Sequence, residues 1–355
     1  MNTILNQYLV RAVLTSTALV LVVLLALAGL IEFIAQLEDI RNDFDTPQAI
    51  LYTALRLPGL AFEMLPVSAL IGSLLGLGAL AAKSEIIVMR SAGLSVWRLG
   101  GMVAWAGLVM LTLAGLVGEF IGPPLDYYAR NMRAEARSGQ TDGRFGNETW
   151  VKDGPVYLHL QRVNPEFEFG SLYLFRFDAE NRLDAIAKAE NAGIDGNDNW
   201  RLENFRETRF RDDGVQVITQ SLAVESFGVN TEMLGSAMAR TSSLSARGLI
   251  GFIDYLERNN LDTRAYTTEL WYRIARTVSI MIMPVLALAF VFGSLRTGGA
   301  GSRLIIGVVI GLAYYLASEM LANSGQVFDL NPALIAWLPT IVLLVVTVFA
   351  LARVR

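Results

Sequence analysis

Six apolar stretches, each long enough to cross a lipid bilayer as a helix, constrain this chain more than any other feature of its sequence. A crossing needs about 20 mostly apolar residues, and 53% of the 355 residues are hydrophobic while only 17% are charged. Three of the stretches precede a long polar segment and three follow it. The sequence therefore predicts an α+β membrane protein in a 3+3 arrangement, with transmembrane helices over residues 12–34, 59–82, 100–121, 269–292, 304–322 and 332–351.

The polar segment between the third and fourth stretches has the pattern of a β-domain. Asp-Gly pairs mark four tight turns in it. Between the turns apolar and polar residues alternate, as Val156, Leu158 and Leu160 do with Tyr157 and His159. Such short alternating strands predict an all-β sandwich or an open barrel of about 100 residues. The predicted domains are therefore residues 1–137 with three spans, 138–245 with the β-domain, and 246–355 with the last three spans.

Small residues recur at every fourth position on two of the predicted spans. Ser68, Gly72 and Gly76 lie in the second span, and Gly307 and Gly311 lie in the fifth. Small side chains let two helix backbones approach closely in a membrane, where van der Waals packing drives association. We expect both faces to hold neighbouring helices.

Basic residues are distributed unequally between the two sides of the predicted spans. The short loops on one side carry only Arg41 and Arg56. Because basic loops stay in the cytoplasm, the sequence predicts cytoplasmic termini and an inserted domain on the opposite side of the membrane. The side with both termini carries eight basic residues: Arg11, Lys83, Arg90, Arg98, Arg296, Arg303, Arg353 and Arg355.

The stretch over residues 83–99, KSEIIVMRSAGLSVWRL, separates the second span from the third. It is too short and too charged to span a bilayer, and it is too apolar for an ordinary polar loop. A helix that lies at the membrane surface and is broken near Gly93 satisfies both facts. We interpret this stretch as the binding site of a cytoplasmic partner protein.

Enzymatic chemistry has little support in the sequence. The chain has no cysteine and one histidine, His159, which excludes thiol chemistry and multi-histidine metal sites. The glycine-rich loop over residues 298–303 lacks the Lys-Ser/Thr pair and the spacing of a phosphate-binding loop. We expect no catalytic residue, no cofactor, no metal and no nucleic-acid partner, and a structural role for His159.

Arg130, Arg133 and Arg137 share one face of a helix that is expected to leave the membrane after the third span. One interpretation is a solvated basic face that balances neighbouring acids. The other is a clamp for an anionic lipid headgroup, because guanidinium groups hold phosphates with forked hydrogen bonds. The residues alone leave both open.

Four acidic residues, Glu32, Glu63, Glu119 and Glu319, are expected near the outer ends of their spans. Ionisable groups in a membrane suggest a transport path, so an ion-coupled secondary lipid transporter is the alternative function. Placement at the membrane rim is favoured, because all four carboxylates can reach the interface and the two halves show no clear inverted repeat.

The stretch Ser84–Gly93 resembles the S-E-φ-x-V-M-x-x-x-G segment, φ being apolar, of the lipopolysaccharide export permeases. Leu65-Pro66 with the glycines that follow it is similar to the family's second span. The segments WVKDG at 150–154 and FVFGSLR at 290–296 match as well, and these two favour the LptG-type subunit over its LptF-type partner. Together the matches cover the whole chain.

This resemblance implies a permease subunit of the bacterial inner membrane that takes lipopolysaccharide from the outer leaflet. It implies a heterodimer with an LptF-type permease, driven by two copies of a cytoplasmic ATPase, LptB. The inserted domain would be a periplasmic β-jellyroll that passes the lipid to a bridge of LptC and LptA. The single membrane helix of LptC would lie beside the first span.

Residue by residue, the resemblance makes Glu85 the acidic contact of the ATPase, within a coupling segment that includes Ile86, Met89, Arg90 and Gly93. It assigns Arg130 and Arg133 to the phosphates of the lipid, with Arg137 on the same face. One departure stands out, because the stretch over residues 31–39 has acids where the family often has lysines. Either Arg41 and Arg56 replace those lysines, or cations bridge acid to phosphate, or the partner subunit supplies that part of the clamp.

Overall fold

The computed structural model describes residues 2–38, 44–138, 148–162, 168–195, 199–211, 213–238, 241–292, 299–327 and 330–354. By contacts the chain divides into two compact units. The helical unit comprises Met1–Gln36, Thr53–Asp126 and Arg264–Arg355, and the sheet unit comprises Leu37–Tyr52 and Tyr127–Thr263. These units group residues by packing rather than by membrane crossing, so the predicted domain limits at 137 and 245 stay a prediction.

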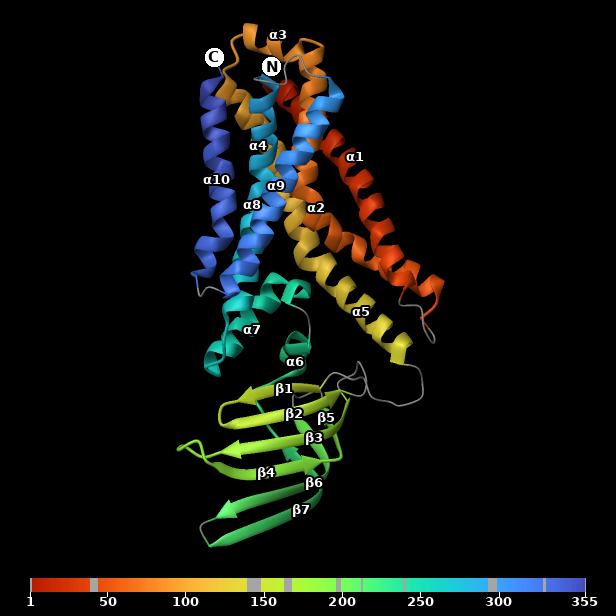
Figure 1. Ribbon diagram of the computed structural model, residues 1–355, viewed down its shortest axis with the longest axis vertical. Coiled ribbons are helices and arrows are strands. Elements are labelled where there is room, and N and C mark those ends of the chain that lie inside the picture. Colours follow the sequence, from red (N-terminus) through yellow and green to blue (C-terminus); the bar gives the residue numbers. More distant parts are fainter. Residues whose placement is uncertain are drawn as a thin grey trace. The chain divides into compact units, whose positions relative to one another are not determined.

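Six helices of the described residues are long and apolar enough to cross a membrane, which confirms the predicted 3+3 arrangement (Figure 1). The α3 helix (Glu85–Ser91) lies between the second and third of them. The six are α1 (Asn2–Leu37), α2 (Thr46–Ala82), α4 (Val96–Leu116) with its continuation, α8 (Arg264–Phe292), α9 (Ala300–Val327) and α10 (Pro332–Arg353).

The second helix begins earlier than the sequence predicts. The sequence predicts a helix for the second span only from residue 59, yet α2 starts at Thr46 and continues through Pro58, so the predicted start is wrong. The Asp45 side chain accepts a hydrogen bond from the backbone N–H of Gln48 at 3.1 Å, which satisfies one of the free donors at a helix start. Pro47 suits the first turn, where no intrahelical donor is needed.

The third membrane helix passes two prolines without ending. A π-helical turn, Val117–Ile121, follows α4, and α5 (Gly122–Ser138) follows it directly. In that turn the backbone N–H of Gly122 donates to the carbonyl of Val117. Because Pro123 and Pro124 have no N–H to donate, a widened turn just before them lets the chain stay helical.

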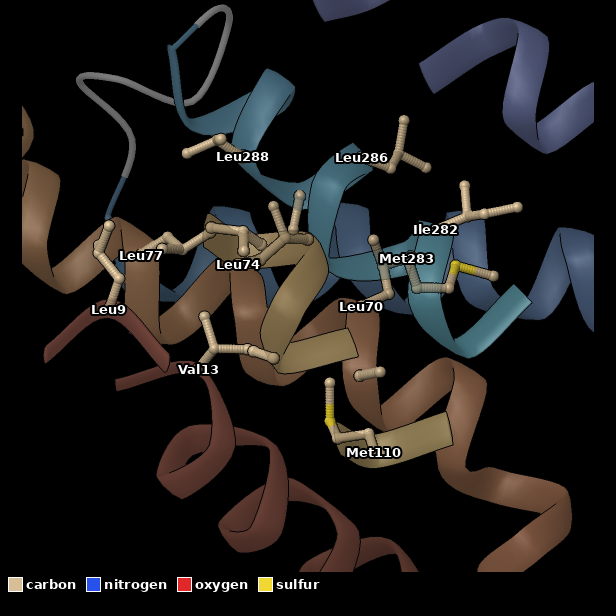
Figure 2. Packing of buried hydrophobic residues seen from close by; sticks show 14 of the residues in the cluster. Leu9, Val13, Leu70, Leu74, Leu77, Met110, Ile282, Met283, Leu286 and Leu288 are labelled. Atoms are coloured by element: carbon tan, nitrogen blue, oxygen red, sulfur yellow. The ribbon is translucent and has the colours of Figure 1, made fainter. Parts of the chain in front are cut away.

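The main core of the helical unit is a large cluster of buried residues, chiefly leucines, methionines and valines from α1, α2, α4 and α8 (Figure 2). The predicted small-residue face of α2 lies against α1. A Cβ added at Gly72 would lie 2.4 Å from the Cα of Thr17, and one added at Gly76 would lie 2.9 Å from the carbonyl oxygen of Ala12. On α9, Gly307 similarly lies against Leu74 and Ile71 of α2. Both predicted faces therefore hold neighbouring helices.

The sheet unit contains seven antiparallel strands in one sheet: β1 (Glu148–Asp153), β2 (Val156–Arg162), β3 (Glu168–Phe177), β4 (Leu183–Ala189), β5 (Asn191–Ile194), β6 (Trp200–Arg211) and β7 (Gly214–Glu225). Both β4 and β5 pair with β3 on one side and β6 on the other, and only Glu190 separates them. They act as one interrupted strand, so the sheet is an up-and-down meander (Figure 1). Alternate residues such as Leu158, Leu160 and Leu174 are fully buried, as the alternating pattern predicts.

Polar contacts fix the helix α7 (Ala246–Arg258) to the first hairpin of the sheet. The Tyr255 hydroxyl donates to the carbonyl of Lys152 at 2.8 Å and accepts from the backbone N–H of the same residue at 3.1 Å. The Asn259 side chain accepts from the N–H of Gly154 at 2.8 Å, and the Lys152 ammonium donates to the carbonyl of Asn259 at 2.9 Å. This hairpin contains the WVKDG segment at 150–154, so Lys152 and Gly154 of that segment have a structural role in fixing α7. Between β7 and α7 lie the short helices α6 (Thr231–Met238) and η2 (Thr241–Ser243).

Candidate functional site

The α3 helix shows the break that the sequence predicts. Ser84 precedes it in the left-handed region with φ 61°, and Gly93 follows it with φ 90°, a conformation that favours glycine. The next helix starts with the Ser95 hydroxyl accepting from the N–H of Arg98 at 3.2 Å. The turns at Ser84 and Gly93 thus separate α3 from α2 and from α4.

One face of α3 is held in the helical unit and the other is exposed. Ile86 is 2% exposed and Met89 8%, and both belong to the main buried cluster. Ile87 and Val88 are 44% and 63% exposed. Of the predicted coupling residues, Ile86 and Met89 therefore anchor α3, while sequence reasoning missed Ile87 and Val88. Their position between the buried pair was the signal, because residues i+1 and i+2 of a helix face away from i and i+3.

The charged residues of α3 contact two other helices. The Tyr8 hydroxyl of α1 donates to Oε2 of Glu85 at 2.7 Å. The Arg90 guanidinium lies over the ring of Phe292, at the end of α8, 5.4 Å from its centroid. Gly93 is exposed, and a Cβ added there would meet nothing within 4 Å. Glu85 is thus half-buried and hydrogen-bonded, at the edge of the exposed face.

Arg56 lies between two carboxylates. It forms an ion pair with Glu32 of α1, and its Nε is 3.2 Å from Oδ1 of Asp126. The side chain of Gln36 donates to the same Glu32 oxygen at 3.1 Å. Glu32 therefore has an internal cationic partner in this chain. The other basic residue of that predicted clamp, Arg41, lies outside the described residues.

Arg130, Arg133 and Arg137 all lie on α5, as the sequence predicts. The Arg133 guanidinium is 5.3 Å from the ring centroid of Tyr52, and its Nη1 donates to the Tyr52 hydroxyl at 3.5 Å. Arg130 is half-buried, and the side chain of Arg137 lies outside the described residues. A cation held over an aromatic face is partly desolvated, which strengthens its attraction for an added anion.

A second polar cluster lies among α2, α8 and α9, at the level where the sequence places Glu63 and Glu319. The Tyr272 hydroxyl donates to Glu319 at 3.3 Å, and the Arg276 guanidinium lies 4.6 Å from the Tyr272 ring centroid and 5.5 Å from that of Phe62. Glu63, Tyr272 and Arg276 line a small shared pocket. Sequence reasoning missed Arg276, although the spacing of Glu269, Arg273 and Arg276 along one helix face was readable.

His159 packs in an aromatic row on the sheet. Its ring centroid is 4.7 Å from that of Trp150 and 6.2 Å from that of Tyr173, its register partners on β1 and β3. Within the described part of the chain, no group of three or more His, Cys, Asp or Glu residues is arranged to hold a metal ion. The polar clusters described above are therefore α3, the arginines of α5, the ion pairs at the far end of α1, and the group around Tyr272 and Arg276.

Comparison with known proteins gives a consistent family assignment. The family model for the lipopolysaccharide export system permease LptF/LptG matches residues 7–353. The chain is 29% identical over 355 residues to the lipopolysaccharide export system permease protein LptG of Haemophilus influenzae, with 99% of both chains covered. It is 28% identical to LptG of Escherichia coli K12, covering 99% of this chain and 98% of that protein. To LptF of the same organism it is 24% identical, covering 97% and 93%.

Proposed function

We propose, because the chain belongs to the LptF/LptG family of lipopolysaccharide export permeases, that it is the LptG-type subunit of an ATP-driven lipopolysaccharide exporter. It extracts lipopolysaccharide from the inner membrane and passes it to a periplasmic bridge for export to the outer membrane. The observation that carries this is the match of one family model over membrane helices and sheet alike. Higher identity to proteins named LptG than to those named LptF supports the subunit type.

Energy enters from a second protein in this proposal. The glycine-rich loop lacks a phosphate-binding motif, so ATP is hydrolysed by a partner, two copies of an LptB-type ATPase. The exposed face of α3, with Ile87 and Val88 beside Glu85, supports a docking surface for it. A second permease of the LptF type completes the membrane part. The family match does not favour the alternative, an ion-coupled secondary lipid transporter.

The proposed orientation places α3 and both termini in the cytoplasm and the sheet in the periplasm. Within the helical unit, α3, the start of α1 and the end of α10 lie at the same end (Figure 1). There Leu351 of α10 packs with Val96, just after α3. The excess of basic residues on this side supports its cytoplasmic placement. The sheet is then available to LptC and LptA.

Arg130 and Arg133 hold the phosphates of the lipid in this proposal, with Arg137 on the same helix. The position of Arg133 over Tyr52 supports it, because the aromatic ring holds the guanidinium at a fixed place on this face of the helix. Arg56 is assigned to the same clamp more weakly, since Glu32 and Asp126 already pair with it.

Co-purification tests the assembly. The tagged chain, extracted from native membranes, is expected to bring down a second six-span permease and a cytoplasmic ATPase. Glu85→Lys is expected to lose the ATPase while keeping the second permease. Glu257→Lys, an equal charge change at an exposed residue of α7, serves as the control. Recovery of the full complex with Glu85→Lys would reject Glu85 as the contact.

Photocrosslinking tests the clamp. Crosslinkers at Arg130 and Arg133 are expected to label lipopolysaccharide, and the double alanine variant is expected to bind less of it in detergent. Arg182→Ala and Arg258→Ala, two exposed arginines of the sheet unit, are the matched controls. Equal lipid binding by the clamp variant and the controls would reject the clamp.

A further inference from the structure

We propose that Tyr8 is a positioning residue that ties Glu85 to α1, so that α1 carries displacement of α3 to the opposite end of the helical unit. The inference rests on the proposed function, because it requires that a partner moves α3. It goes beyond the proposed function, because docking of an ATPase at Glu85 does not by itself require a role for Tyr8 or transmission through α1.

The contact at the first end joins residues that are far apart in the sequence. The Tyr8 hydroxyl donates to Oε2 of Glu85 at 2.7 Å across 77 residues. A hydrogen bond to an ionised carboxylate is shorter and stronger than one between neutral groups. Tyr8 is 44% exposed, so this bond lies at the surface and a docking protein can reach it. Because an ionised carboxylate accepts several hydrogen bonds, a cation from a partner can contact Glu85 while Tyr8 stays bonded to Oε2.

Apolar packing holds the same end of α1 against the cluster that anchors α3. Leu9 and Val13, labelled in Figure 2, are 1% and 0% exposed. They share a buried cluster with Ile86 and Met89. The backbone of Thr17 then lies against Gly72 of α2, where even a methyl group would overlap. The first half of α1 thus sits in fixed register with α3 and α2.

The body of α1 is suited to transmit movement. It is one uninterrupted helix of 36 residues without proline, which gives a rod of about 54 Å. Beyond Val20 most of its side chains are exposed, including Leu27, Leu30 and Ile31. Few protein contacts therefore oppose movement of this half within the chain.

Ion pairs hold the second end of the rod. Glu32 of α1 pairs with Arg56, which also pairs with Asp126. Gln36 is 4% exposed and donates to Glu32. An anionic phosphate and the Glu32 carboxylate compete for the same guanidinium, since each is a forked acceptor for Arg. The first end of α1 is thus held by packing and by the Tyr8 bond, and the second by ion pairs that an anionic phosphate can replace.

The experiment uses the whole transporter in liposomes, with and without Tyr8→Phe, which removes only the hydroxyl. ATPase binding is expected to stay intact, while lipopolysaccharide released per ATP hydrolysed falls by roughly threefold or more. Tyr157→Phe, which removes a hydroxyl from the sheet, is the matched control and is expected to match the wild type. Unchanged release per ATP in Tyr8→Phe would overturn the inference.

A distance measurement separates positioning from simple support of the fold. The chain has no cysteine, so within it spin labels attach only at the exposed positions Leu30→Cys of α1 and Leu334→Cys of α10. The distance between the labels is expected to shift when a nucleotide analogue binds, and Tyr8→Phe is expected to abolish the shift. A shift of equal size in Tyr8→Phe would contradict the route through α1.

Different results would reject docking of the ATPase at Glu85 and the positioning role of Tyr8. If Glu85→Lys keeps the ATPase, the docking contact of the proposed function is wrong. If Glu85→Lys loses the ATPase while Tyr8→Phe couples ATP to release as the wild type does, only the positioning role of Tyr8 is wrong.

Discussion

The close approach of α1 to α2 at Gly72 gives a prediction of opposite signs for two glycines of α2. In Gly72→Ala the new Cβ would lie 2.4 Å from Cα and 2.6 Å from N of Thr17, both backbone atoms of α1. Ordinary contact begins near 3.4 Å, so α1 must move by about 1 Å. Overpacking of this kind costs about 1–3 kcal/mol, against a gain of up to about 1 kcal/mol from replacing glycine in a helix.

Gly59→Ala is the matched control on the same helix, because a Cβ there meets nothing within 4 Å. It is expected to stabilise by about 0.5–1 kcal/mol, while Gly72→Ala destabilises by about 1–2 kcal/mol. Thermal unfolding of the purified complex in detergent, followed with both variants side by side, measures the difference. If Gly72→Ala unfolds at or above the temperature of Gly59→Ala, the close packing of α1 on α2 is refuted.

Three further substitutions test other parts of the structure. Trp200→Phe is expected to lose about 1–3 kcal/mol of sheet stability, because it leaves the carbonyl of Val229 without its 3.1 Å donor; Trp150→Phe, at a 61% exposed position, changes little, and hydrogen exchange of the sheet measures both. Burial raises the pKa of Tyr255 above its ordinary value of 10.0. The stability that the neutral hydroxyl contributes is therefore fully present below about pH 10, the pKa of the unfolded chain, and is lost as the pH rises through the higher pKa of the folded chain. Tyr255→Phe should therefore lower stability at pH 7, yet unfold with a flatter alkaline pH profile. Gly93→Ala is expected to strain the turn after α3 by about 1 kcal/mol or more and to lower ATPase co-purification.

The membrane helices were predictable because a helix that crosses a bilayer needs a long apolar run, and such a run is recognisable in the sequence whatever the local turns and caps are. The break at Gly93 was equally predictable, since a positive φ of 90° requires a residue that tolerates it. The start of α2 was not, because Pro58 reads as a helix start in isolation. The local bond from Gln48 to Asp45 was the competing signal.

The candidate site was only partly predictable, for a physical reason. The sequence shows which side chains are charged, and the structure shows which charges are already paired. Arg56 illustrates this, because its partners Glu32 and Asp126 come from two other helices. Tyr8 and Glu85 are likewise joined only by the fold. The helical spacing of Arg130 and Arg133, by contrast, correctly predicted that both lie on the same helix.

ATP-dependent transfer of lipopolysaccharide tests the central claim most directly. Liposomes containing this chain, its partner permease and the ATPase are supplied with lipopolysaccharide, and its arrival on a soluble periplasmic acceptor is followed. The account predicts transfer that requires ATP, is lost with Glu85→Lys, and is insensitive to ion gradients. Transfer driven by an ion gradient without ATP, or by this chain in the absence of the ATPase, would contradict it.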